Sequence, residues 1–381
     1  MIDTSLAAAQ AIESDSRRWN LILTDEENHV IESESGDIIS MTHSIETSEN
    51  GIVIGDLITQ NVNIVLNRKF RGNFKIEQGT TFYMKYMLHD RPGSVPMGKF
   101  TIMSATKEKN QIKINAKDFF SSLDLTGEYS SELIYPAPLK EVIEEICSGL
   151  GIEIHLYEPL MILTDLTTDT YEKTYDKAGS QLFVLSDGAD IDIHSLSEKT
   201  VGDALRACAA FMGVMLAQDR NGDLTCIRPS KVPVEISPSR AADPDFSADY
   251  VKIKRIECKV DDNTTLTRGE IEDKKHDRAI KFSCSVMPFE QSQQSEQMDR
   301  IFAYYNNLTY YPALINYILG DPRIDIFDII KYHSMYEKNG QGELKTYSMP
   351  IMSMNYNFDG GLSCNLQSTA NEKEKGGAAN G

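Results

Sequence analysis

The sequence predicts an α+β fold that is mainly β, with tube-like β-barrel or β-sandwich modules and a small helical α/β region in the middle. Short runs of alternating apolar and polar residues fill the first third of the chain and return in the last third, whereas the middle shows a helical period of three to four residues. We expect units at residues 1–125, 126–235 and 236–372, and a disordered tail at 373–381.

The first third reads as antiparallel strands separated by glycine, asparagine and aspartate. Val62, Ile64 and Leu66, for example, alternate with Asn61 and Asn63, which indicates a strand with one buried face. The expected strand runs are 19–24, 36–45, 52–66, 81–88, 98–107 and 111–118.

Two amphipathic helices are predicted next. The first spans 138–151 and ends at glycine, with Glu144 and Glu145 on its exposed face. The second begins after Thr200 as N-cap. The expected apolar faces consist of Leu139, Val142, Ile143, Ile146 and Leu150 in the first helix, and Val201, Leu205, Cys208, Ala209 and Met212 in the second.

Later segments are predicted from turn and period signals. Residues 164–192 are polar and are expected to form a surface loop or a strand insertion. Asn221 and Gly222 supply the positive φ angles of a two-residue hairpin loop. A third helix is expected from Ser295 to Asn307, followed by closing strands.

Composition excludes several function classes. The formal net charge of −19 and a pI of about 4.8 repel phosphate backbones and anionic lipids, so we expect no specific nucleic-acid binding and no membrane binding by the chain itself. No secretory leader pattern and no run of about 18 apolar residues occurs. We therefore expect the protein to be made and kept in a cytoplasm.

No catalytic, cofactor-binding or metal-binding residue is predicted, and hence no cofactor. The chain lacks HExxH, GxSxG, GxxxxGK[ST] and a strand-GxGxxG-helix unit. The cysteines lie at least eighteen residues apart and are expected to be reduced, and the histidines are scattered. These residues are Cys147, Cys208, Cys226, Cys258, Cys284 and Cys364, and His29, His43, His89, His155, His194, His276 and His333.

Two local features have a structural and a functional interpretation. Trp19 could stack on a ligand beside two arginines, but its place at the start of an apolar run favours a core or interface anchor. Asp187, Asp190 and Asp192 lack the glycine and distal glutamate of a calcium loop, which favours a solvated acidic loop.

Several motifs resemble those of the phage tail and baseplate hub proteins, the family found in contractile phage tails, tailocins and siphophage tail tips. Residues 36–67 resemble the opening barrel of that family, with Ile54, Gly55 and Leu57 at the matching positions. Residues 97–129 resemble its G-x-F-x-I and I-x-A-x-D stretch, matched by Gly98, Phe100, Ile102, Ile114, Ala116 and Asp118.

The resemblance continues to the end of the chain and covers roughly residues 9–371. Residues 136–154 resemble the family's small helical element, 200–229 its second helix and hairpin, and 349–370 its closing hairpin. Residues 320–332 resemble a G-D-P-x-hydrophobic-x-x-G-D-x-I segment, with Phe327 where glycine is common. We interpret Gly320, Asp321 and Pro322 as structural turn residues.

The resemblance implies a structural, non-enzymatic role in a virion or phage-like particle assembled in the bacterial host cytoplasm. Such hubs are homotrimers in which two barrel-like modules per subunit look pseudo-sixfold. They join a hexameric tail tube protein to a three-fold spike or tail-tip protein, and the tape measure protein is a further expected partner. An acidic channel wall would let DNA pass without adhering, which is our hypothesis for the charge.

Two alternatives stay open at this stage. Related tail proteins can carry a cell-wall-degrading enzyme domain, but no His, Asp and Cys constellation follows the hub-like hairpin. A β-rich carbohydrate- or peptide-binding protein could use an aromatic platform, although helix and interface packing explains the same residues more simply. These residues are Tyr304, Tyr305, Tyr310 and Tyr311.

Overall fold

The computed structural model describes residues 18–369, apart from 153–189 and the short gaps 48–50, 71–72, 90–93, 124, 132, 134–136, 192, 198, 231–232, 288–290 and 318. Three expectations fall outside the described residues. They are almost all of the loop at 164–192, the acidic cluster at Asp187 and Asp192, and the tail at 373–381.

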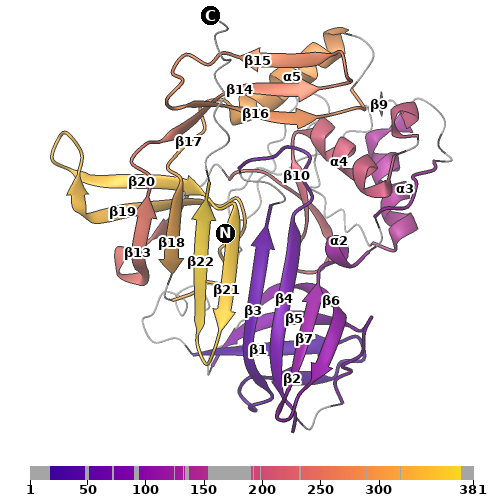
Figure 1. Ribbon diagram of the computed structural model, residues 1–381, viewed down its shortest axis with the longest axis vertical. Coiled ribbons are helices and arrows are strands. Elements are labelled where there is room, and N and C mark those ends of the chain that lie inside the picture. The colour runs from indigo at the N-terminus through magenta and orange to yellow at the C-terminus, as the bar shows by residue number, and fades with distance from the viewer. Residues whose placement is uncertain are drawn as a thin grey trace, which may run out of the picture.

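The largest sheet among the described residues has eleven strands and joins the beginning of the chain to its end (Figure 1). Its order is β13-β18-β22-β21-β3-β4-β7-β6-β5-β1-β2, and all neighbouring pairs are antiparallel. The strands are β1 (Trp19–Asp25), β2 (Val30–Glu32), β3 (Ile38–Glu46), β4 (Thr59–Asn67), β5 (Thr81–Leu88), β6 (Ser94–Lys107), β7 (Gln111–Lys117), β13 (Ala241–Phe246), β18 (Ala313–Tyr317), β21 (Ser353–Phe358) and β22 (Leu362–Ser368).

The joint in this sheet is the ladder between β3 and β21. Met41 pairs with Phe358, and the register continues without a shift to Glu46 opposite Ser353. On β4, Val62, Ile64 and Leu66 are buried as predicted. Alternation therefore placed the inward face of β4 correctly, while the partner of β3 comes from the far end of the chain.

The long strand β6 bends the sheet. It pairs with β5 through its first half and with β7 through its second half, and both ladders contain a register shift. Rings from the resulting layers meet inside: Phe100 lies 5.3 Å from His43 and 6.0 Å from Phe82, measured between ring centroids. The mainly β prediction is confirmed. Of the two expected forms, barrel or sandwich, a closed barrel is not found within the described residues, because no ladder joins the two ends of the sheet.

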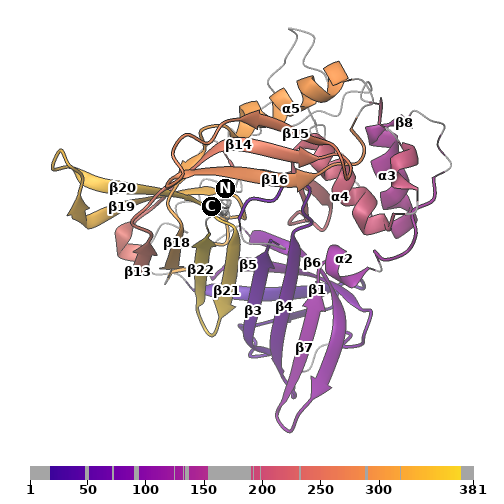
Figure 2. The same cartoon turned by 45° about the horizontal axis from the view of Figure 1, so that its top comes forward.

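Smaller sheets complete the β structure (Figure 2). In one, β14 pairs in parallel with β16 and in antiparallel fashion with β15 and β17, and in another β12 pairs in parallel with β19, which pairs with β20. Two short pairs are β8-β9 and β10-β11. The bounds are β8 (Ala137–Pro138), β9 (Asp190–Ile191), β10 (Met215–Gln218), β11 (Leu224–Ile227), β12 (Pro233–Ile236), β14 (Val251–Lys259), β15 (Thr265–Gly269), β16 (Asp277–Ser283), β17 (Thr309–Tyr310), β19 (Ile329–Lys338) and β20 (Leu344–Pro350).

The middle helices form as their period predicts. The hydroxyl of Thr200 accepts a hydrogen bond from the backbone amide of Asp203 and so caps the N-terminus of α4. Gly213, at φ 69°, ends the helix. Gly151, at φ 67°, follows α3. The helices are α2 (Phe119–Ser122), α3 (Leu139–Leu150), α4 (Val201–Met212) and α5 (Gln291–Tyr305), with 3-10 turns η1 (Ile193–Leu196) and η2 (Pro238–Arg240).

A segment from the N-terminal third lies against α4 and β10. The amide of Gly55 donates to the Val214 carbonyl (2.8 Å), and the amide of Ile58 donates to that of Leu216 (2.8 Å). Gly55 has φ +87°, and a Cβ there would lie 2.9 Å from the Ala210 Cβ. A side chain at position 55 would therefore push the segment off the helix.

Three local expectations need correction. The β10-β11 loop has five residues instead of two, because the carboxylate of Asp219 accepts the amides of Asn221 and Asp223 and closes a wider turn. Gly222 has a positive φ (99°), whereas Asn221 does not. Helix α5 begins four residues before its predicted start.

The third correction concerns the paired glutamates of α3. Glu144 and Glu145 were expected on the exposed face, yet both are half-buried. The Tyr129 hydroxyl donates to Glu145 at 2.6 Å, so the segment before the helix covers this face.

Candidate interaction surfaces

The described residues contain no group of three or more potential metal ligands among histidine, cysteine, aspartate and glutamate. In the same part of the chain, no helix combines the length and apolar character needed to cross a membrane. All six cysteines are free thiols.

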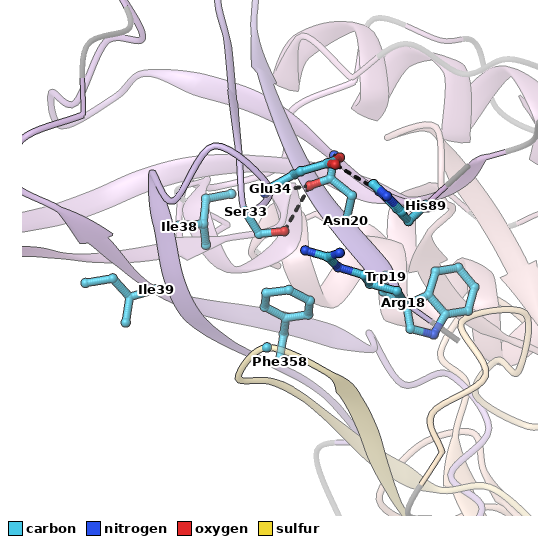
Figure 3. Close-up of a pocket in the computed structure, with 10 residues that line it drawn as sticks. Arg18, Trp19, Asn20, Ser33, Glu34, Ile38, Ile39, His89 and Phe358 are labelled. Atoms are coloured by element: carbon cyan, nitrogen blue, oxygen red, sulfur yellow. Dashed lines mark hydrogen bonds and ion pairs between the residues drawn. The ribbon is translucent and has the colours of Figure 1, made fainter. Parts of the chain in front are cut away.

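Trp19 is a core residue, 5% exposed, with its ring edge-on to Tyr86 at 6.0 Å. A pocket of about 130 Å³ lies beside it (Figure 3). Its polar wall is already engaged, since His89 Nδ1 lies 2.8 Å from the Glu34 carboxylate and the Ser33 hydroxyl donates to an adjacent asparagine. The core-anchor interpretation of Trp19 is confirmed.

Arg220 lies where three distant parts of the chain meet. Its guanidinium donates to the Asp325 carboxylate (3.1 Å) and to the Ile324 carbonyl (2.7 Å), and it also reaches the carbonyls of Pro96 and Pro322. The five donors of a guanidinium form a fixed fork that can serve several acceptors at once. This largely buried side chain fastens the β10-β11 hairpin to β6 and to the turn before β19.

Buried amides connect neighbouring parts of the same junction. The Gln60 side chain donates to the Gln218 carbonyl (3.0 Å), and the Gln218 side chain donates to the Lys99 carbonyl (2.8 Å). His43 Nε2 lies 2.9 Å from Gln60 Oε1. The Asp118 carboxylate accepts a hydrogen bond from the backbone amide of Gln60 (2.8 Å). Burial lowers the pKa of His43 to about 4 and raises the pKa of Asp118 to about 6, because each charged form loses its hydration.

Residues 320–328 form a turn that is mostly buried. The Arg323 guanidinium pairs with the Asp321 carboxylate at 2.7 Å, with both side chains almost fully covered. Phe327 is fully buried at φ 61°, in the left-handed region that glycine adopts readily. This conformation agrees with the glycine that is common here in the hub proteins that the sequence resembles.

Strands β19 and β20 extend from the body as a two-stranded arm, which we define as residues 329–350 (Figures 1 and 2). Strand β12 pairs with β19 only as far as Tyr332. The register shifts between His333 and Lys338, where the Ser334 hydroxyl accepts the amides of Tyr336 (3.3 Å) and Glu337 (2.9 Å). The result is a bulge that turns side chains outward at the tip.

The root of the arm is fixed by aromatic rings. Tyr347 stacks on Phe246 at 4.0 Å and meets the edge of Tyr311 at 4.9 Å, while Tyr332 lies 5.4 Å from Phe246. The ammonium of Lys345 lies over the Tyr347 ring at 4.4 Å. Such packing holds the arm at a defined angle to the body.

A groove of about 910 Å³ lies between the 53–56 segment, the first turns of α4 and the ends of β14 and β16. Its apolar lining includes Val53, Val260 and Phe282. Asp261 and Asp262 contribute carboxylates at the end of β14. In both views the arm and α4 lie on opposite sides of the molecule (Figures 1 and 2).

The tyrosines proposed as an aromatic platform are mainly packing residues. Tyr305 and Tyr310 are buried, and the Tyr305 hydroxyl donates to the Gly213 carbonyl at 2.9 Å. Sequence reasoning missed the arm and Arg220. Exposed Met335 and Tyr336 beside a glycine-rich turn are the signal that could have indicated the arm, whereas Arg220 looks like an ordinary loop residue.

No protein-family model and no curated protein matches the chain. Among solved structures, the 43 kDa tail protein of prophage MuSo2 from Shewanella oneidensis aligns with a TM-score of 0.49 and 14% identity, covering 92% of this chain and 97% of that one. A tail protein from Neisseria meningitidis MC58 aligns with a TM-score of 0.51 and 9% identity over 93% of this chain and 98% of that one. The latter likeness shows a common fold over nearly the full length of both chains.

Proposed function

We propose that the chain is a non-catalytic structural protein of a phage tail or phage-like contractile particle, acting as the hub of the baseplate or tail tip. In this role three copies form a ring that adapts the hexameric tail tube to a three-fold spike and forms part of the channel. The partners are two further copies of the chain, the tube protein, the spike or tail-tip protein and the tape measure protein.

The fold carries this proposal. The likeness to a tail protein extends over 93% of this chain, so it includes most of the joined sheet and most of the helical middle. Motifs quoted from the sequence, such as Gly55 and Phe327, take up the backbone conformations that their turns need. Shared architecture together with matching turn positions supports a tail role more strongly than either observation alone.

The continuous sheet and the Arg220 junction suit a ring that must withstand mechanical force. The eleven-stranded sheet runs from the first strands to the last, and Arg220 ties three chain segments together. Forces applied at either end of the sheet would therefore pass through ladder hydrogen bonds instead of a flexible linker. The net charge of −19 would keep a DNA-conducting wall from binding its cargo.

Light scattering on the purified full chain tests the proposal, first alone and then with the tube and spike proteins encoded beside it. We expect a species of three times the 42.7 kDa chain mass, formed either by the chain alone or once the partners are added. A folded chain that stays monomeric with both partners would contradict the hub. That result would favour the alternative of a carbohydrate- or peptide-binding protein.

Assay of the purified chain on peptidoglycan tests the enzymatic alternative. We expect no release of soluble fragments, because Asp118, whose raised pKa of about 6 would suit a general acid, is buried in the core, and so is the thiol of Cys208. Fragment release that survives further purification would point to a tail-associated cell-wall-degrading enzyme.

A further inference from the structure

The tip of the arm carries exposed apolar side chains on a projecting element. Tyr336 is 87% exposed, more than any other large hydrophobic residue that the structure describes, and Met335 and Leu344 are 55% and 51% exposed. Burying a tyrosine, a methionine and a leucine at one contact removes several hundred Å² of surface from water. A cluster of this size on a projection has the chemistry of an interface anchor.

The arm is organised before it binds anything. Ser334 holds the bulge that turns Tyr336 outward, and the Tyr347 hydroxyl donates to Glu337 across the two strands. The stacked rings at the root add rigidity. Little conformational entropy remains to be lost on docking, which favours affinity.

The tip is unsuited to adding a strand from a partner. Beyond His333 the bulge interrupts the ladder between β19 and β20, and Lys338 and Lys345 border the strands. Bulges and lysines are the devices that keep an exposed strand edge from pairing with another sheet. We therefore expect the arm to dock through its side chains.

The charge of the arm complements the rest of the same chain. The arm contains three lysines (Lys331, Lys338, Lys345) and two glutamates (Glu337, Glu343) in a protein of net charge −19. A segment with a slight positive charge is attracted to the acidic body of another copy, while two bodies repel each other. This distribution favours arm-to-body contact between copies over body-to-body contact.

The groove beside α4 can receive such a tip. It has about 910 Å³ of space, and Val53, Val260 and Phe282 are part of its lining. Five carboxylates and four basic side chains also line it, and Asp262 is paired with Lys259 at 2.7 Å. Asp261 is therefore the carboxylate that we expect a lysine beside the tyrosine to meet. Hydrogen bonds from the amides of Asn263 and Thr264 lower the pKa of Asp261, so its carboxylate stays charged.

We infer that Tyr336 at the tip of the arm of one copy docks in the groove of a second copy. Arm and groove lie on opposite sides of the molecule, so the contact is head-to-tail, and a head-to-tail contact closes into a ring when its rotation permits. The inference rests on the proposed trimeric hub and assigns residues to the contact between its subunits.

Two single substitutions test the arm. Tyr336→Ser removes the anchor, and Tyr83→Ser removes a 42% exposed tyrosine from β5 as the matched control. We expect the association constant of the ring to fall by about 30-fold for the first variant, the usual loss at an interface hot spot, and to stay unchanged for the control. Circular dichroism melts confirm that both variants fold.

Cross-linking tests the groove. Met335→Cys, which keeps the Tyr336 anchor, and Ser283→Cys are made as separate proteins, because Met335 is exposed at the tip and Ser283 is an exposed residue lining the groove. Mixing them under mild oxidation should give a disulfide-linked dimer on a non-reducing gel. Replacing the first partner by Tyr83→Cys should give none.

The outcomes separate this inference from the proposed function. If wild-type protein forms a trimer that Tyr336→Ser leaves intact, the arm contact is wrong and the hub proposal stands. If Tyr336→Ser weakens the trimer but no disulfide to Ser283→Cys forms, the groove is not the docking site. Wild-type protein that forms no ring even with tube and spike proteins would contradict the hub proposal itself.

Discussion

Phe327 is a residue whose packing holds the backbone in an unfavourable conformation. A φ of 61° costs a non-glycine residue about 1–2 kcal/mol. The ring is fully buried, the Phe327 amide donates to the Ile351 carbonyl (2.7 Å), and its own carbonyl accepts the Ser230 amide (2.9 Å). Burial and two backbone hydrogen bonds together outweigh the strain.

Substitution of Phe327 by glycine and by alanine separates strain from packing. Both variants lose the ring, which for alanine costs about 3–5 kcal/mol. Glycine also relieves the strain, so we expect Phe327→Gly to exceed Phe327→Ala in unfolding free energy by about 1 kcal/mol. Urea unfolding measures both. At the exposed helical position Glu141, we expect the alanine variant to be more stable than the glycine variant. An alanine variant that is also the more stable one at position 327 would argue against strain at Phe327.

His43 and Asp118 contact the same glutamine and make opposite contributions to acid stability. The folded protein holds the pKa of His43 near 4, below its usual 6.5, so the unfolded chain takes up this proton first and stability is lost as pH falls from 6.5 to 4. The pKa of Asp118 is about 6, above its usual 3.8, so the folded state is protonated first and stability rises as pH falls through 6. The two effects largely cancel.

Replacing His43 by phenylalanine should expose the contribution of Asp118. The new ring would take the place of the imidazole between Phe100 and Tyr356, whose rings flank it at 5.3 and 6.0 Å. As pH falls from 6.5 to 4, the variant should gain up to about 3 kcal/mol of stability relative to wild type. This is the free energy that corresponds to the difference between the pKa of His43 in the folded and the unfolded chain. Urea unfolding across this range measures the gain, and parallel profiles would contradict it.

Burial of apolar residues could be predicted from the sequence, but burial of polar residues could not. Val62 and Trp19 belong to apolar runs that need a core, so local pattern suffices for them. His43 and Asp118 are buried only because Gln60 and the β10 region supply hydrogen bonds from elsewhere in the chain. A linear pattern does not specify such partners.

At the scale of elements, local signals predicted helices better than turns. Helix α4 has its N-cap at Thr200 and its apolar face within one short segment, and both were predicted, whereas Gly213 as its end was not. The β10-β11 loop was predicted wrongly, because the Asp219 side chain closes a wider turn than the Asn-Gly dipeptide suggests. The loop must also present Arg220 to the turn before β19.

Removing the guanidinium tests how firmly this hairpin is fastened. Arg220→Met keeps a similar stem but removes the donor that serves Asp325 and the three backbone carbonyls of Pro96, Pro322 and Ile324. We expect a loss of about 2–3 kcal/mol in unfolding free energy, less than for a fully buried pair because the Asp325 side chain is 34% exposed. Arg206→Met, at a surface pair with Asp203, should cost under about 1 kcal/mol. Equal losses in urea unfolding would argue against the fastening role.

At the scale of the whole molecule, β-strand segments from both ends of the chain form one sheet. Alternation predicted the strands and the mainly β class, yet it could not reveal that β3 pairs with β21, since pairing partners share no local signal. The boundaries at residues 125, 235 and 372 stay a prediction. The joined sheet nevertheless implies that the first unit depends on the last.

Expression of residues 1–125 alone tests this dependence. The fragment lacks β21, so one edge of β3 is open and should pair with other copies, giving aggregates. A peptide of residues 351–369, which contains β21 and β22, should restore a monomeric complex in light scattering, whereas a peptide of scrambled order should not. A fragment that is monomeric without the peptide would show that the unit is independent.

The ladder between β3 and β21 also has a consequence during synthesis. Strand β3 leaves the ribosome about 300 residues ahead of β21, which at about 5–20 residues per second is a delay of about 15–60 s. Nascent chains on neighbouring ribosomes of one messenger expose the same open edge at the same time. Elongation rate and chaperone access, more than the stability of the finished fold, should therefore decide how much of the newly made protein reaches the native state.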